Sequence, residues 1–212
     1  MPTPKELYYE KSARELIKNL QSRHFEAHYC PTKAQALEMA LALIHEGATV
    51  GWGGATSAIQ IGLIDAVKAG PYTAFDRDRA KTPEERSAIM NQCFGADVFL
   101  TGANALSMDG QMVNVDGMGN RTAAIIYGPK TVLVIAGMNK ICADVESAVR
   151  RARTVAAPTN QQRFLGKTPC TVTGCCGDCR SEDCICNQIL ITRHCRPAGR
   201  IKIILVGEEL GF

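Results

Sequence analysis

The chain has 212 residues, of which 46% are hydrophobic, and its 24 Lys and Arg residues nearly balance 21 Asp and Glu residues, for a net charge of +3. This content favours one domain spanning residues 1–212 and built around one substantial core. No apolar run reaches the ~20 residues that a membrane helix needs, and the first residues lack the profile of a secretory signal. We therefore expect a cytoplasmic protein with reduced thiols, no membrane span and no nucleic-acid partner.

The first third of the chain predicts alternating helices and strands. Residues 5–23 place apolar side chains at helical spacing, and residues 25–30 follow as a short strand. Thr32 is a suitable N-cap for a second helix, which Gly47 would end. A strand, a Gly-rich turn and a third helix are then predicted over residues 49–68.

The remainder continues this alternation. Helices are predicted at residues 83–93 and 144–153, and apolar strands at 98–101, 131–136 and 201–207. Short apolar strands that alternate with amphipathic helices indicate a buried, mostly parallel sheet with helices on both faces. The fold class that we expect is therefore α/β, with a Rossmann-like sheet.

Residues 111–115 and 123–127 are two further strand candidates. The Asp-Gly-Met-Gly-Asn turn at residues 116–120 lies between them and carries glycines that suit a hairpin. We therefore expect an antiparallel excursion within the sheet.

Seven of the ten cysteines fall between Cys170 and Cys195, in polar, turn-rich sequence. Thiolates at such short gaps can converge on one soft metal ion or cluster without a hydrophobic core to position them. We define residues 168–196 as the cysteine segment and predict that it is a metal-binding insertion between core elements. Disulfides are not expected, because the thiols should be reduced.

The Gly-rich turn between the strand at 49–52 and the next helix is a candidate anion site. Backbone N–H groups of Gly53 and Gly54 and the hydroxyls of Thr56 and Ser57 could hold an anion there. The alternative is a tight turn with no ligand. The spacing matches neither the phosphate loop of nucleotide triphosphatases nor a dinucleotide-binding fingerprint.

Four polar residues complete the predicted pocket: Asn104, Asp109, Asn120 and Lys140. Asn104 follows the strand at 98–101, so it should stand at the carboxyl edge of the sheet, where open α/β folds bind ligands. Lys140 could pair with a phosphate or carboxylate. For the Asn and Asp residues, which neighbour glycines, capping of turns is the structural alternative.

Five motifs occur in order along the chain: Gly51-Trp-Gly-Gly-Ala-Thr-Ser, Gly95-Ala-Asp-Val-Phe-Leu-Thr-Gly-Ala-Asn-Ala, Asp109-Gly, Gly119-Asn-Arg and Gly137-Met-Asn-Lys. With these motifs the chain resembles the LUD-domain (lactate utilization protein) family over nearly its whole length. That family is similar to a broader group that includes ribose-5-phosphate isomerase, glucosamine-6-phosphate deaminase and CoA transferases. The resemblance implies the Rossmann-like fold of that group, which hosts many reactions.

The sequence from Pro169 to Asn187 resembles the cysteine-bearing extension of one LUD subgroup, and this implies four metal ligands: Cys170, Cys176, Cys179 and Cys186. Cys175, Cys184 and Cys195 are additional to that pattern. An all-thiolate set fits an iron–sulfur cluster, with 4Fe–4S as the first choice, and zinc is the alternative. Only Cys176 and Cys179 have the spacing of a zinc knuckle, which favours the cluster.

The resemblance implies a component of lactate-to-pyruvate oxidation that binds a small anionic metabolite and passes electrons to redox partner subunits. A homo-oligomer is compatible with this expectation. One alternative is a non-redox binding or regulatory module in which zinc only stabilises the cysteine segment. Another is a sugar-phosphate isomerase or hydrolase that grips phosphate with the Gly-rich turn. A covalent CoA-transfer mechanism is disfavoured, because the turn at Asn104 carries no glutamate.

Overall fold

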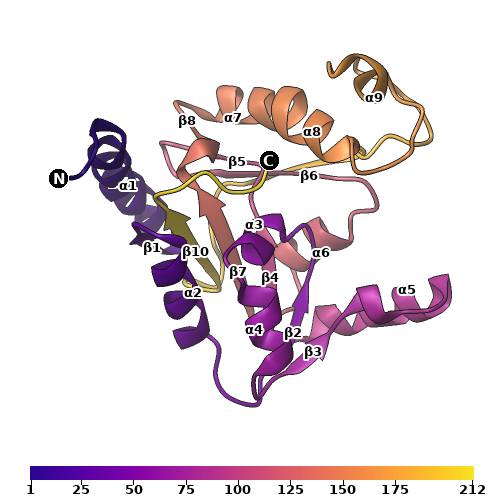
Figure 1. Cartoon of the computed structure of the whole chain (residues 1–212), viewed down its shortest axis with the longest axis horizontal. Coiled ribbons are helices and arrows are strands. Elements are labelled where there is room, and N and C mark those ends of the chain that lie inside the picture. The colour runs from indigo at the N-terminus through magenta and orange to yellow at the C-terminus, as the bar shows by residue number, and fades with distance from the viewer.

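The computed structural model describes residues 1–212 and contains two sheets (Figure 1). The larger sheet has six strands in the order β1-β10-β7-β4-β2-β3, and every neighbouring pair is parallel. Its strands are β1 (Glu26–Cys30), β2 (Thr49–Trp52), β3 (Thr73–Phe75), β4 (Val98–Gly102), β7 (Thr131–Gly137) and β10 (Ile201–Val206). The α/β fold with a mostly parallel sheet is therefore confirmed. The last strand, β10, belongs to this sheet and lies between β1 and β7.

Helices cover both faces of the larger sheet because its strands are apolar on both sides. Along β7, Val132, Val134 and Ala136 join one core cluster, whereas Leu133 and Ile135 join the other. The first cluster packs against α1 (Pro4–Ser22) and α6 (Asn120–Ile126), and the second against α2 (Lys33–Ala42), α3 (Thr56–Gln60) and α4 (Leu63–Ala69). Two-sided burial of this kind is typical of parallel sheets.

The smaller sheet has the order β8-β5-β6-β9, with β6 antiparallel to both of its neighbours. Its strands are β5 (Ala105–Ser107), β6 (Met112–Asp116), β8 (Ile141–Cys142) and β9 (Gln188–Thr192). A small core that includes Val113 and Ala148 joins it to a helical run at the top of Figure 1. That run consists of α7 (Val145–Arg151), a π-helical turn (Ala152–Ala156) and α8 (Ala157–Gln161).

Two predicted helices have different bounds in the structure. The helix predicted within residues 57–68 is divided into α3 and α4, because Gly62 adopts the left-handed conformation with φ of 80°. The second helix begins at the predicted N-cap, where the Thr32 side chain accepts from the Gln35 N–H. It ends at Ala42, with Leu43 as its C-cap, before Gly47.

The hairpin prediction at residues 111–127 is wrong in its second strand. Residues 123–127 lie mainly in α6, where buried Ala124 and Ile125 pack into the first core cluster. Antiparallel β6 instead pairs with β5 and with β9, whose first residue, Gln188, faces Asp116. An apolar run of this length fits a buried helix as well as a strand, and tertiary packing decides between them.

The cysteine segment lies between α8 and the end of the smaller sheet. Its regular elements are α9 (Pro169–Thr173) and β9, and residues 174–187 contain no helix or strand. Figure 1 shows α9 at the upper right, beyond α8. No helix in the protein is sufficiently long and apolar to span a bilayer.

Candidate functional site

A cavity of about 410 Å³ opens at the carboxyl ends of the central strands. One wall comes from the sheet: residues 54–57 after β2, Ala103 and Asn104 after β4, and Lys140 after β7. The facing walls come from residues 115–121, from the segment around α5 (Pro83–Gln92) and from the end of α8. Parallel strands present such loops at one edge, which is where open α/β sheets bind ligands.

The Gly-rich turn after β2 is fixed to the neighbouring strand β4. Thr101 Oγ1 donates to the Gly53 carbonyl at 2.8 Å, and the Gly102 N–H donates to the Gly54 carbonyl at 3.2 Å. Gly54 has φ of 58°, and a Cβ there would lie 2.4 Å from the Arg121 guanidinium. The left-handed backbone at this turn therefore favours glycine. Gly54 lines the cavity, whereas Gly53 lies behind the lining.

Lys140 is the buried cation of the sheet-side wall. The residue is only 3% exposed, and its Nζ donates to Ser57 Oγ at 3.1 Å and to the Ala103 carbonyl at 2.9 Å. Burial, reinforced by the nearby Arg151 and Arg121 guanidinium groups, lowers the pKa of Lys140 to about 7. A substantial fraction of this amine is therefore neutral near physiological pH.

Arg121, from the first turn of α6, spans the cavity wall and is held at several points. It donates to the Val115 carbonyl and, at 3.3 Å, to Asn104 Oδ1. Its Nε lies 3.7 Å from the Asp116 carboxylate, which also accepts from the Thr122 N–H at 3.0 Å. Asn104 therefore positions a cation rather than merely capping a turn.

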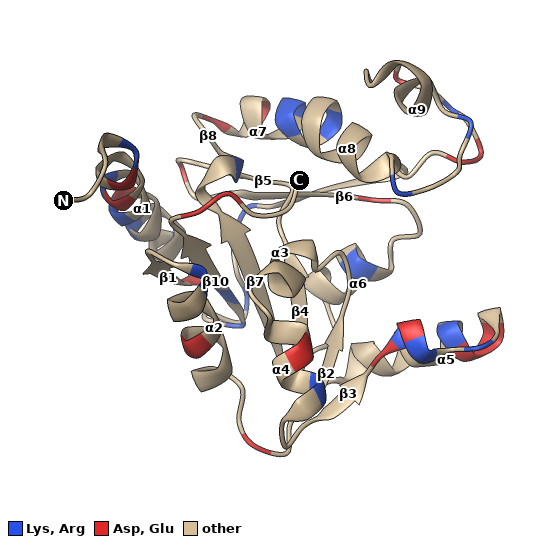
Figure 2. Cartoon of the chain, viewed as in Figure 1, with Lys and Arg blue, Asp and Glu red and all other residues tan.

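Positive charge exceeds negative charge around the cavity. Five basic residues line it, namely Arg77, Arg86, Arg121, Lys140 and Arg163, against two acids, Asp78 and Asp116. In Figure 2 the ribbon of α6 is coloured basic in part, and that of α5 carries both basic and acidic colours. Asp78 forms an ion pair with Arg86 at 3.3 Å, and Asp116 forms one with Arg121 at 3.7 Å. The other three cations, those of Arg77, Lys140 and Arg163, form no ion pair with a carboxylate.

Arg77 is the least satisfied of these cations. Its Nε is buried and has no hydrogen-bond partner, whereas its Nη1 donates to Met90 Sδ at 3.8 Å. Burial is the main cause that lowers the pKa of Arg77. A buried donor without an acceptor is costly, so the Arg77 Nε carries an uncompensated desolvation cost.

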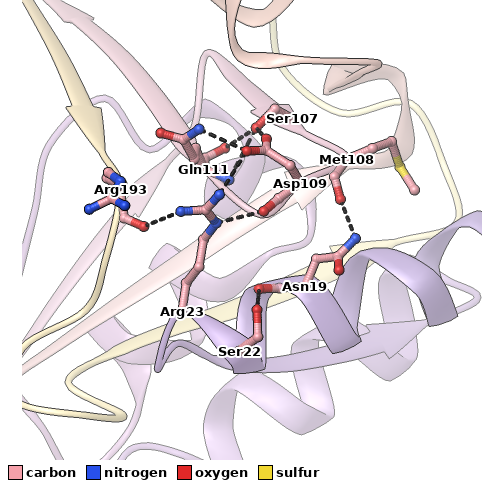
Figure 3. Close-up of polar contacts among 8 residues, drawn as sticks. All are labelled: Asn19, Ser22, Arg23, Ser107, Met108, Asp109, Gln111 and Arg193. Carbon is pink, nitrogen blue, oxygen red and sulfur yellow. Dashed lines mark hydrogen bonds and ion pairs between the residues drawn. The ribbon is translucent and has the colours of Figure 1, made fainter.

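Six of the eight predicted pocket residues line this cavity: Gly54, Thr56, Ser57, Asn104, Asn120 and Lys140. Asp109 is not brought together with them. It lies in the turn between β5 and β6, where it accepts from Gln111 Nε2 and from Arg23 Nη2, each at 2.8 Å (Figure 3). The Ser107 hydroxyl also donates to Asp109. Asp109 thus joins this turn to the end of α1.

The thiols of the cysteine segment lie near one another without forming a ready ligand set. Burial, together with the neighbouring Cys184, Cys176 and Cys170 thiols, raises the pKa of Cys186 to about 12. Cys184 Sγ also accepts from the Cys186 N–H at 3.4 Å. Nevertheless, no three His, Cys, Asp or Glu side chains of the protein are arranged to hold a metal ion.

The remaining cysteines occupy different surroundings. Cys195 is buried in the first core cluster, and its Sγ accepts from the Ile201 N–H at 3.2 Å, so it is separated from the other thiols of the segment. Cys30 and Cys93 are likewise buried in the main cores. Cys175 is exposed.

Ile185 physically connects the cysteine segment with the cavity. It lies between Cys184 and Cys186 in the chain and lines the cavity beside Gly117. A Cβ on Gly117 would lie 3.3 Å from the Ile185 Cα, so the two backbones are in close contact. The Asn187 side chain donates to the Gly117 carbonyl at 3.1 Å.

Sequence reasoning missed the arginines of the facing walls. Arg77 and Arg86 lie around the predicted helix at 83–93, where basic residues are normally solvated, so spacing gave no signal for them. Arg121 was detectable, because it ends the Gly119-Asn-Arg motif on which the family resemblance partly depends. Arg163 belongs to the polar stretch that leads into the cysteine segment.

Comparisons with known proteins agree with this architecture. No curated protein matches the chain in sequence. A solved structure of a DUF162 family protein from Deinococcus radiodurans is similar, with 12% identity and a TM-score of 0.52 over 97% of this chain and 99% of that one. This likeness supports the fold alone.

Two further similar structures come from Chaetomium thermophilum. eIF2B beta is 19% identical over 54% of this chain and 44% of that one, with a TM-score of 0.39. eIF2B delta is 15% identical over 65% and 57%, with a TM-score of 0.37. These scores carry no argument about function. The family model of the LUD domain, in contrast, matches residues 13–206, and the chain therefore belongs to the LUD-domain family.

Proposed function

We propose that this LUD-domain protein binds a small anionic metabolite in the cavity at the carboxyl edge of its larger sheet. The observation that carries the proposal is the set of lining cations, Arg77, Lys140 and Arg163, that have no carboxylate partner. Lys140 is buried and Arg77 is partly buried, and burying a cation without an ion-pair partner is unfavourable, so an anionic ligand would offset that cost at these two residues. The cavity volume of about 410 Å³ suits a metabolite of a few to a dozen heavy atoms.

The charges of the cavity also bear on the alternative sugar-phosphate isomerase or hydrolase. Such chemistry would use Asp or Lys groups as acid and base. Asp116 is bound to Arg121 and to the Thr122 N–H, and Asp78 pairs with Arg86. The site therefore favours anion binding over acid–base catalysis by a carboxylate pair.

Calorimetric titration tests the binding proposal. Pyruvate, lactate and ribose 5-phosphate would be titrated alongside the neutral compounds glycerol and ribose. We expect at least one anion to bind, with an affinity that falls as salt is raised, and no binding of the neutral compounds. Anion binding that persists unchanged in an Arg77→Gln, Lys140→Met double variant would place the site elsewhere and overturn the proposal.

We further propose that the cysteine segment holds an iron–sulfur cluster through Cys170, Cys176, Cys179 and Cys186, as in a component of lactate oxidation. The nearness of Cys170, Cys176 and Cys184 to Cys186 supports a common centre, and an all-thiol set suits a cluster. When bound, a cluster supplies one-electron transfer. The position of Cys184 among these thiols also makes it a candidate ligand in place of one of the four.

Iron, zinc and acid-labile sulfide analysis of anaerobically purified protein distinguishes the two metal hypotheses. Iron and sulfide in nearly equal amounts, with visible absorbance that changes reversibly on reduction, would support electron transfer. Zinc without sulfide would instead support the non-redox module with a structural metal. Protein that binds neither metal after reconstitution would exclude both.

A further inference from the structure

Lys140 has surroundings that suit chemistry as well as charge recognition. Its Nζ is held by one hydroxyl and one carbonyl, those of Ser57 and Ala103, and by no carboxylate. The charged groups close to it are the Arg121 and Arg151 guanidinium groups, both of its own sign. The acids that line the cavity, Asp78 and Asp116, are paired with arginines. This arrangement disfavours the ammonium form and leaves a nucleophilic amine at the cavity wall.

Opposite walls of the cavity carry the groups that would anchor an anion and the amine that would react with it. Arg77 lies on the wall that faces the sheet, where its Nη1 donates to Met90 Sδ at 3.8 Å, whereas Lys140 and Ser57 lie on the sheet side. A ligand anchored by its anionic end could therefore present a second group to the amine. Desolvation and neighbouring cations are the means by which proteins activate lysines for imine formation.

We propose that Lys140 forms an imine with a carbonyl-bearing anion, such as a 2-oxo acid or an aldose phosphate, bound in this cavity. This inference rests on the proposed function, since the same cavity must bind the anion. The Nζ lone pair attacks the carbonyl carbon to form a C–N bond. The carbonyl oxygen then leaves as water, with both of its protons derived from the amine. Ser57 Oγ, 3.1 Å from Nζ, is placed to relay these protons.

Reductive trapping on the intact wild-type protein tests the proposal. Protein is incubated at neutral pH with pyruvate, glyoxylate or ribose 5-phosphate and sodium cyanoborohydride, and adducts are located by mass spectrometry of peptides. We expect one adduct at Lys140 that forms at least about tenfold faster than at Lys130, an exposed lysine paired with Asp97. Glycolate or ribitol 5-phosphate, which lack the carbonyl, should slow the trapping at Lys140 and leave that at Lys130 unchanged.

A Lys140→Arg variant tests the identity of the nucleophile. Arginine keeps a positive charge at the wall but forms no imine under these conditions, so the variant should give no cavity adduct. Anion binding to wild type without preferential labelling of Lys140 would overturn the imine and leave the proposed function standing. Absence of both binding and labelling would overturn both. The competitor experiment uses wild-type protein alone, so it holds even if the variant folds poorly.

Discussion

The cavity and the cysteine segment are adjacent regions that differ in what holds their structure. The sheet-side wall of the cavity continues from β2, β4 and β7, whose residues are buried in two apolar cores. In the cysteine segment, residues 174–187 contain no helix or strand, and Cys175 and Cys176 are exposed. Hydrophobic packing thus fixes the first region before any ligand arrives, whereas the proposed metal would order the second. The comparison teaches that only the first region should be rigid without a ligand.

The largest effect is expected from removing one metal-binding thiol. Cys176→Ser or Cys179→Ser should lose most of the bound iron, because a cluster with one ligand missing is labile. Cys175→Ser is the matched control, since Cys175 is next to Cys176 in the chain, is likewise exposed, and lies outside the proposed ligand set. Iron and sulfide analysis checks the result. Equal iron loss in all three variants would contradict the ligand assignment.

The next largest effect concerns anion affinity. Arg77→Gln should weaken anion binding by about tenfold or more, because it removes a charge-assisted hydrogen bond to the ligand. Arg79→Gln provides the control from the same turn: Arg79 does not line the cavity, and its Nε lies 3.4 Å from Asp76. Isothermal titration would compare the two variants, and similar affinities in both would remove Arg77 from the site.

A pH effect follows from Lys140. Its pKa is about 7 in the folded protein and near its ordinary value of 10.5 when unfolded, so above pH 7 the unfolded state binds more protons. Stability should therefore rise with pH by up to about 1.4 kcal/mol per unit through this window. Urea unfolding at pH 7.0 and 8.5, compared with Lys140→Met, isolates the contribution, because other titrating groups cancel in the difference. An unchanged difference between the two proteins would contradict a lowered pKa.

The smallest effect is expected at Asp109. Asp109→Asn weakens the contacts with Arg23, Ser107 and Gln111. Stability should fall by about 1 kcal/mol, with no change in anion affinity. Thermal unfolding and titration together check this. Loss of anion binding without loss of stability would contradict this prediction and indicate that Asp109 contributes to the anion site.

Much of the fold could be predicted because burial leaves a regular pattern in sequence. The strands at β4, β7 and β10 are apolar on both faces, and α1 carries helical spacing. The run at residues 123–127 failed because its apolar side chains are compatible with either element, and packing selects a helix. The three-residue strands β3 and β5 were too short to leave a pattern.

The candidate site was predictable on the sheet side and not on the other. Asn104 and Lys140 follow predicted strands, so the edge rule for parallel sheets located them. Arg77 reaches the cavity through the tertiary arrangement of a surface segment, which no local pattern encodes. The prediction that Asp109 lies in the pocket failed because a turn between two strands can also dock against a distant helix, here at Arg23.

The most direct test of the contrast between the two regions is hydrogen–deuterium exchange on the full chain, before and after anaerobic iron–sulfur reconstitution. The account predicts rapid exchange over residues 174–187 without metal and at least about tenfold slower exchange with it. It also predicts that β4 and β7 remain protected in both states. Protection of residues 174–187 in the metal-free protein, or unprotected β4 and β7, would contradict the account.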